Sequence, residues 1–185
     1  MIKELISTAT IDGETPFWVA CKYGYLESVQ LLLNHKRVDV NRVDKRGQRP
    51  IYLVCLLGHI EIVKLLLNNH RVDINKANAG GWTPFFIAFI RGYLEIMEHI
   101  LASQNDVDLA IESTGGKRAL VINIARKRAN EEKASWEGEE ECQKRKRDCS
   151  KIVELLESFE RNPIEKRFKL RLKLGLAGKI QFDFI

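Results

Sequence analysis

A motif that occurs three times limits the folds open to this chain more than any other feature. Its copies read TPFWVACKYGYLESVQLLL from Thr15, RPIYLVCLLGHIEIVKLLL from Arg49 and TPFFIAFIRGYLEIMEHIL from Thr83, so they begin at equal intervals along the chain. Glycines keep this period in two registers, with Gly13, Gly47, Gly81 and Gly115 in one and Gly24, Gly58 and Gly92 in the other. Such self-similarity indicates a solenoid, in which each structural unit is stacked on the next.

Each copy predicts a pair of short helices. A Thr-Pro pair favours a helix start, because threonine can cap free N–H groups and proline needs no donor at the first helical position. The first helix should end after eight or nine residues at a glycine in the left-handed C-cap conformation. A second helix follows, for example over 26–33, where Val29, Leu32 and Leu33 lie at helical spacing. One pair cannot bury both of its helices, so neighbouring pairs must stack.

These residues resemble the ankyrin repeat. The signature of that family appears here as Thr83-Pro84-Phe85-Phe86-Ile87-Ala88, as Gly58-His59-Ile60-Glu61-Ile62-Val63 and as Asp39-Val40-Asn41. The resemblance covers roughly residues 11–159. It implies an all-α fold, an ankyrin-repeat α-solenoid of stacked helix-turn-helix units joined by β-hairpin-like turns, with a helical insertion in the last unit.

The repeat spacing also predicts the unit boundaries. We expect an ankyrin array over 1–160, followed by a capping helix and tail over 161–185. Its units should be a partial cap and four further units, at about 1–10, 11–44, 45–78, 79–112 and 113–160. In the last unit the interval from Met97 to Val153 is much longer than the regular interval from Val63 to Met97, which places an insertion near 128–149.

The insertion and the C-terminal segment both favour helix. The inserted residues are strong helix formers apart from Gly138, so we expect a prolonged antiparallel helix pair with a turn near 136–138. After it, Asn162, Pro163 and Glu165 make a helix start, and Gly175 is a plausible stop. The stretch FKLRLKL also alternates as a strand would, and helix is the favoured interpretation.

Two substitutions depart from the family signature. Arg49 stands where the capping threonine is expected in the second unit, which removes a cap worth about 1 kcal/mol. The signature's histidine is replaced in all three units, by Trp18, Tyr52 and Phe86. We expect these aromatic side chains to form a stacked column between units, with a contribution to a binding surface as the alternative.

No motif of an enzyme is present, and we expect neither catalysis nor a cofactor. The sequence contains no zinc-protease motif, no nucleophile elbow and no phosphate-binding loop. Cys21 and Cys55 occupy equivalent positions of the first helix, which indicates burial. Cys142 and Cys149 lack the Cys-x-x-Cys spacing of a zinc site, so no metal is predicted.

The ankyrin resemblance implies a protein partner that binds the concave face of turns and first helices. The positions carried over residue by residue as partner-binding are Tyr23, Lys45, Arg46, Gln48, Leu56, Leu57, Trp82, Ile90 and Arg91. Tryptophan, tyrosine and arginine are common anchors of interfaces. Leu56, Leu57 and Ile90 would add an apolar patch, and the second turn is basic. We therefore expect a partner segment with apolar side chains flanked by acidic residues.

Other interpretations remain open. Nucleic acid or another anionic surface could bind Arg126 to Arg128, the KRKR run at 144–147 and the basic tail, although 25 acidic residues nearly balance 30 basic ones. The array could instead be a structural spacer or targeting domain of a larger protein. Asn41 and Asn75 match the pattern at which ankyrin asparagines are hydroxylated, while hydrogen bonding to the hairpin backbone is the favoured role.

Composition sets the expected location. No apolar run approaches the ~18 residues of a membrane span, and the four cysteines are too few for a disulfide framework. We expect a monomer in the cytoplasm, with the nucleus as the second location.

Overall fold

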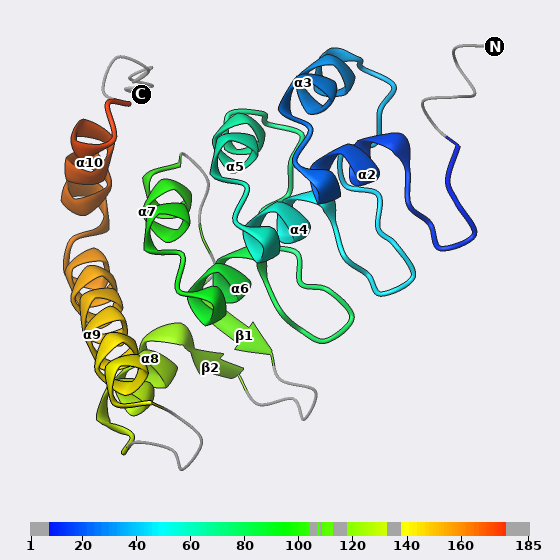
Figure 1. Cartoon of the computed structure of the whole chain (residues 1–185). Coiled ribbons are helices and arrows are strands. Elements are labelled where there is room, and N and C mark those ends of the chain that lie inside the picture. The colour runs from blue at the N-terminus through cyan, green and yellow to red at the C-terminus, as the bar shows by residue number, and fades with distance from the viewer. Residues whose placement is uncertain (1–7, 104–106, 108, 113–117, 133–137, 177–185) are drawn as a thin grey trace.

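The computed structural model describes residues 8–103, 107, 109–112, 118–132 and 138–176. In chain order, its elements are α2 (Pro16–Tyr23), α3 (Leu26–Asn34), α4 (Pro50–Leu57), α5 (Ile60–Leu67), α6 (Pro84–Arg91), α7 (Leu94–Ala102), β1 (Ala110–Glu112), β2 (Arg118–Leu120), α8 (Val121–Asn130), α9 (Glu139–Arg161) and α10 (Pro163–Lys173). The first helices of successive units lie in one row, the second helices α3, α5 and α7 lie in another, and the turns project from one side (Figure 1). The all-α repeat solenoid expected from the sequence is confirmed.

Local capping explains where the first helices begin. The backbone N–H of Trp18 donates to Thr15 Oγ1 at 3.2 Å, and that of Phe86 donates to Thr83 Oγ1 at 3.1 Å. Arg49 makes no such bond at the start of α4. All three helices begin with proline and end at a glycine with a φ of 75°, 80° or 72°, a left-handed conformation that favours glycine.

The turns between units repeat one backbone pattern. The N–H groups of Thr10, Asp44 and Asn78 donate to the carbonyl oxygens four residues later, at 3.0, 3.2 and 3.0 Å. In the fourth unit the turn widens into the antiparallel hairpin β1–β2, with Ala110 opposite Leu120. Gly115, which keeps the glycine period in the sequence, lies outside the described residues.

The core runs continuously through the stack because equivalent positions are buried in every unit. Phe17, Ile51 and Phe85 share one position of the first helix and are at most 1% exposed. Val29, Val63 and Met97, at one position of the second helix, are fully buried. The first helices pack against one another along the stack, and so do the second helices, as a solenoid requires.

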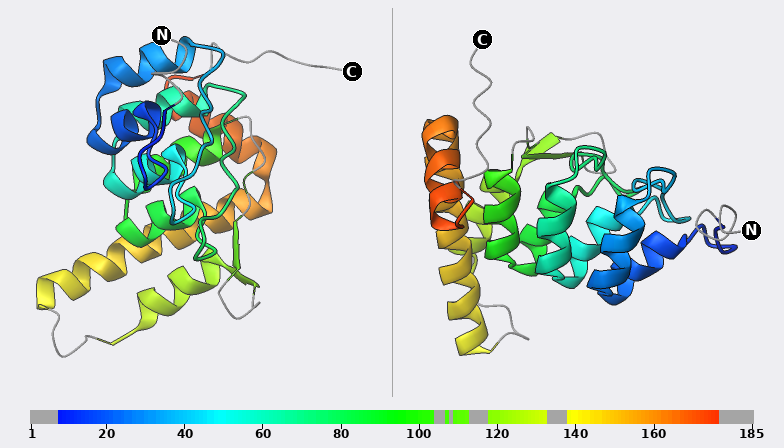
Figure 2. Two further views of the ribbon diagram at one scale, coloured as in Figure 1. Left: turned by 90° about the vertical axis from the view of Figure 1, so that its right-hand side faces the viewer. Right: turned by 90° about the horizontal axis from the view of Figure 1, so that it is seen from above.

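The fourth unit contains the predicted long helix pair. α9 runs for 23 residues against 10 for α8, so most of the extension lies on α9. The two helices project together beyond the stack (Figure 2). Of the predicted turn, residues 136 and 137 lie outside the described part, and α9 begins directly after Gly138. Cys142 and Cys149 are buried on α9.

The C-terminal segment is a helix, as favoured over a strand. The side chain of Asn162 accepts from the backbone N–H of Glu165 at 3.1 Å, which caps α10. Gly175 follows the helix with a φ of 67°. α10 continues from the end of α9 and packs against α7 (Figure 1). Together α9 and α10, residues 139–173, form the end wall of the stack.

The prediction that Trp18, Tyr52 and Phe86 form a stacked column between units is wrong. Trp18, Tyr52 and Phe86 are all buried, but within the described part of the chain no ring contact joins one to another. Trp18 makes a polar link instead, since its Nε1 donates to the carbonyl oxygen of Gln48 in the next turn at 2.9 Å.

Candidate functional site

The predicted partner-binding residues lie on the surface formed by the turns and by the last turns of α2, α4 and α6, here named the turn face. Backbone hydrogen bonds hold its turns in register. The N–H of Lys45 donates to Asp12 O at 2.9 Å, and that of Ala79 donates to Arg46 O at 3.2 Å. The spacing of side chains along the turn face is therefore fixed by the stack itself.

Two aromatic side chains of the turn face are exposed yet held in place. Trp82 is 42% exposed and meets the ring of Phe86 edge-on at 5.8 Å between centroids. Tyr23 is 58% exposed and stacks on Tyr25 at 6.0 Å. Lys22 Nζ lies 5.6 Å from the Tyr23 ring. Both rings can thus contact a partner with little further ordering.

The apolar patch is smaller than the sequence predicted. Leu57 is 42% exposed, but Leu56 and Ile90 are partly buried and pack against the core. These residues occupy the last turn of a helix, where successive side chains point in different directions. Leu57 and Trp82 are therefore the better-exposed apolar members of the predicted site.

The charged members differ in how freely they face solvent. Arg46 and Arg91 are exposed, and burial raises the pKa of Tyr52 while the charge of Arg91 lowers it, which places Arg91 near that hydroxyl. Lys45 pairs with Asp12 at 3.2 Å in an exposed ion pair of small energetic value.

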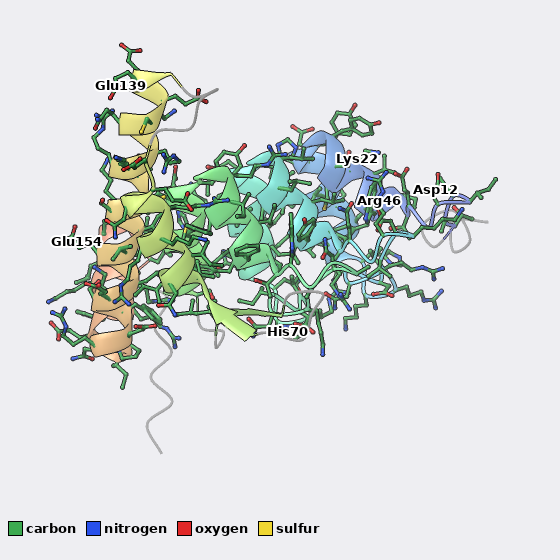
Figure 3. All side chains as sticks on the ribbon, turned by 90° about the horizontal axis from the view of Figure 1, so that it is seen from below. Asp12, Lys22, Arg46, His70, Glu139 and Glu154 are labelled. Carbon is green, nitrogen blue, oxygen red and sulfur yellow. The ribbon has the colours of Figure 1, made fainter. Side chains whose placement is uncertain are left out.

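Gln48 is half-buried, and its backbone holds the turn: its N–H donates to Asp44 Oδ1 at 2.7 Å and its carbonyl accepts from Trp18. Close to this turn, a hydrogen bond from Lys22 to Glu14 raises the pKa of Lys22. Asp12, Lys22 and Arg46 lie at the N-terminal end of the stack (Figure 3), so basic and acidic side chains alternate there.

Comparison with known families decides the identity of the repeat. A model described as Ankyrin repeats (3 copies) matches residues 1–78 and 17–113, which together span more than half of the 185 residues. The chain belongs to the ankyrin repeat family. No curated protein matches it. Ankyrin repeats are generally protein–protein interaction modules and are typically non-enzymatic.

Asn41, one of the two asparagines of the ankyrin hairpins, is held by the next unit through its side chain. Asn41 Nδ2 donates to Arg71 O at 2.6 Å, and Asn41 Oδ1 accepts from the N–H of Asp73 at 3.0 Å, so both ends of its carboxamide join the next unit. Asn75 is exposed. The structural role expected for Asn41 is present, and hydroxylation at Asn41 and Asn75 stays a prediction.

Sequence reasoning missed a polar link between the first two ankyrin units. The guanidinium of Arg71 donates to the carbonyl oxygens of Leu33 and, at 3.2 Å, of Val38, and so satisfies groups left free at the end of α3. The recurrence of arginine at positions 37 and 71 is the signal that could have identified it.

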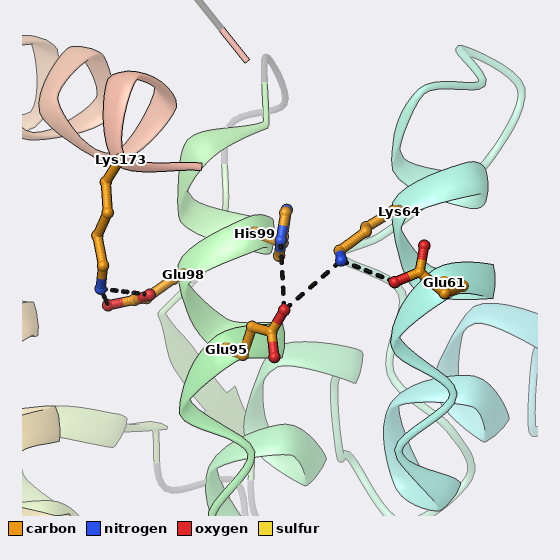
Figure 4. Close-up of polar contacts among 6 residues, drawn as sticks. All are labelled: Glu61, Lys64, Glu95, Glu98, His99 and Lys173. Atoms are coloured by element: carbon orange, nitrogen blue, oxygen red, sulfur yellow. Dashed lines mark hydrogen bonds and ion pairs between the residues drawn. The ribbon is translucent and has the colours of Figure 1, made fainter. Parts of the chain in front are cut away.

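A hollow lies on the second-helix side of the ankyrin stack, between α5, α7 and α10. Its volume is about 540 Å³, and it is lined by Lys64, His70, Glu95, His99, Arg171 and Lys173 among others. Lys64 lies 2.8 Å from Glu61 and 3.5 Å from Glu95, and Lys173 lies 2.6 Å from Glu98 (Figure 4). The charges around the hollow therefore balance, and they select no class of ligand.

His99 lies in the wall of this hollow. Its Nε2 is 4.0 Å from Glu95 Oε1, and the residue is only 6% exposed. Burial lowers the pKa of His99, and the positive charge of Lys64 lowers it further, against the raising effect of nearby carboxylates.

The insertion does not present its KRKR run on one face. The guanidinium of Arg145 donates to the carbonyl oxygen of Arg128 across the helix pair, so it is committed to packing. Lys144 and Arg147 are exposed. Within the described part of the chain, no group of three or more histidine, cysteine or acidic side chains could hold a metal ion, and no helix is long and apolar enough to cross a membrane.

Proposed function

We propose that this chain binds a partner protein through the turn face. The observation that carries the proposal is the pair of exposed rings, Trp82 and Tyr23, each in contact with a neighbouring ring. Interfaces gain most of their energy from a few aromatic and arginine anchors, and anchors that are already ordered lose little entropy on binding. The general role of ankyrin repeats supports this assignment.

The charges beside these rings indicate the chemistry of the partner. Arg46 lies in the second turn and Arg91 at the end of α6, both exposed, and Leu57 is exposed at the end of α4. A segment with one or two apolar side chains flanked by acidic residues complements this arrangement. The smaller apolar patch favours a short apolar element over a long amphipathic helix.

Affinity capture with the turn face intact and altered tests the proposal. The variant combines Trp82→Ala with Arg46→Glu and should lose the partner proteins that the wild-type chain retains. Leu31→Ser is the matched control, because Leu31 is 74% exposed on the second-helix side and should leave capture unchanged. If the wild-type chain and the double variant capture the same partner proteins, the turn face is not the binding site.

A further inference from the structure

The C-terminal helix α10 exposes an apolar stripe at a place where a solenoid normally presents polar residues. Ile164, Phe168 and Leu172 are four residues apart, so they share one face of the helix. They are 85%, 47% and 52% exposed. A terminal capping element usually has a polar outer surface, which keeps the stack from associating further. The stripe therefore indicates that something covers this side of α10.

The opposite side of α10 is already occupied. Leu170 is 3% exposed, and Arg171 donates to Ala102 O at 3.2 Å and so binds the end of α7. Arg167 lies over the ring of Phe159 of α9 at 5.9 Å. Because half of the helix is fixed to the stack, a partner cannot enclose it in a groove. The remaining half suits a flat surface.

The basicity of the chain is concentrated in the α10 part of this end wall. The wall as a whole, residues 139–173, contains eleven lysines and arginines against eight aspartates and glutamates, a net charge of +3, but α10 alone carries +4, whereas the whole chain carries +5. The rest of the chain is thus close to neutral. On α10 itself Glu165 is the only acidic residue. A second copy of the chain would bring two such walls together, and their like charges would repel.

Cationic side chains border the stripe. Lys169 pairs with Glu165 and Lys173 pairs with Glu98, yet the two lysines remain 67% and 62% exposed. An apolar stripe bordered by lysines is the pattern of helices that lie in the plane of a membrane interface. Nucleic acid would use the cations alone and would leave the three apolar side chains in water.

We infer that α10 attaches the chain to an anionic membrane surface, with Ile164, Phe168 and Leu172 inserted between lipids and the lysines at the level of the headgroups. The inference is independent of the turn face, which lies on another side of the stack. It describes a helix that rests on the bilayer without crossing it, since α10 has only 11 residues.

Vesicle co-sedimentation tests the inference with the full chain. The chain should sediment with vesicles of phosphatidylcholine and phosphatidylserine and much less with phosphatidylcholine alone. The triple variant Ile164→Ser, Phe168→Ser, Leu172→Ser should lose at least about tenfold in affinity for the vesicles. Leu31→Ser at the other end of the stack is the matched control and should bind as the wild-type chain does.

Further arms separate the other occupants of the stripe. Ile164→Ser alone, at the most exposed position, should retain the circular dichroism spectrum and still weaken binding. Equal binding of vesicles by the triple variant, or equal affinity for duplex DNA, would make the wall a general polyanion site and overturn the inference. So would a dimer that the triple variant dissociates, or vesicle binding that requires removal of residues 177–185.

Discussion

The three regular units and the fourth unit are joined to their neighbours in different ways. Between regular units, one side chain closes over the C-cap glycine of the preceding unit: a Cβ on Gly24 would lie 2.9 Å from the His59 ring, and one on Gly58 would lie 3.0 Å from the Tyr93 ring. Among the described residues, none beyond the chain neighbours of Gly92 has an atom within 4 Å of a Cβ placed on it. The period therefore repeats a contact as well as a helix pair, and this contact ends where the fourth unit begins.

The fourth unit relies on packing between long helices instead. Ile152 and Leu156 of α9 are buried in the shared core. Arg126 of α8 pairs with Glu157 of α9 at 2.8 Å, and Arg128 lies over the ring of Phe89 at 5.5 Å. The repeat period therefore accounts for the regular interfaces, whereas the last interface depends on the packing of long helices and on the side-chain pairs that join them.

The largest effect is expected from cavities made on either side of this boundary. Leu156→Ala in α9 and Leu66→Ala in α5 replace side chains that are 0% and 1% exposed, and each should lower the free energy of unfolding by about 3 kcal/mol. Hydrogen exchange should distinguish them. Leu156→Ala should weaken protection in α8, α9 and α10, while Leu66→Ala should weaken α3 to α7, because solenoid units couple to their nearest neighbours. Equal loss of protection in α2 and α3 for both variants would contradict the distinction.

A pair of glycine substitutions measures the repeated contact directly. Gly58→Ala and Gly92→Ala impose the same left-handed strain of about 1–2 kcal/mol, because their φ angles are 80° and 72°. Only Gly58→Ala also meets a ring, so it should cost about 1 kcal/mol more. Urea unfolding of the two variants gives the difference.

The ring is tested by repeating both substitutions in a Tyr93→Ala background. The excess cost at Gly58 should then disappear, since the atom that the new Cβ meets is gone. If Gly58→Ala stays more costly than Gly92→Ala without Tyr93, the contact is not what separates the two positions.

The regular part of the fold could be predicted from the sequence because each signal acts locally. Threonine caps, first-turn prolines and C-cap glycines act within a few residues, and the repeat period aligns them without knowledge of the structure. The helix at 163–173 followed from the same logic at Asn162. Contacts between units were harder to predict. Arg71 and the ring of Tyr93 reach residues about one repeat period away, and the sequence does not show the direction in which these side chains point.

Arg49 offers the next smaller effect, because α4 is the one helix among α2, α4 and α6 that lacks a side-chain cap. Arg49→Thr should raise the free energy of unfolding by about 1 kcal/mol, since threonine would accept from a free N–H as Thr83 does. The change also removes a buried Nε that has no hydrogen-bond partner. Thr83→Ala is the mirror control and should lose a similar amount. No gain from Arg49→Thr would mean that its bond to Ala77 O, at 3.4 Å, outweighs a cap.

The predicted binding residues followed the fold only in part. The residues implied by the resemblance lie along the turns and the ends of the first helices, but the exposure of each one depends on how far its side chain turns from the core. Leu56 and Leu57 are adjacent in sequence, yet Leu56 packs inward and Leu57 faces solvent. The exposed stripe on α10 was harder still to predict. From the sequence alone its apolar residues cannot be told from core residues, and only the structure shows that Leu170 is buried and Phe168 exposed.

The smallest expected effect concerns His99, which lies beside α10 in the third unit. Leu31 and Leu65 occupy the equivalent repeat position in the first two units. Charged groups surround His99 from every element packed against it, namely Glu61 and Lys64 of α5, Glu95 and Glu98 of α7, and Arg171 and Lys173 of α10. Burial is the largest influence and keeps the folded pKa of His99 below its ordinary value of 6.5.

That shift gives stability a defined dependence on pH. As pH falls below 6.5, His99 takes up a proton in the unfolded chain before it does so in the folded one, so the free energy of unfolding declines until the folded pKa is passed. Leucine and glutamine do not titrate, so the variants His99→Leu and His99→Gln should both show a flatter dependence of the free energy of unfolding on pH than the wild-type chain. Urea unfolding of all three proteins between neutral and mildly acidic pH measures the difference. Parallel curves would show that the hollow beside α10 stays hydrated enough for His99 to titrate as it does in the unfolded chain, and that α10 does not seal the stack at this position.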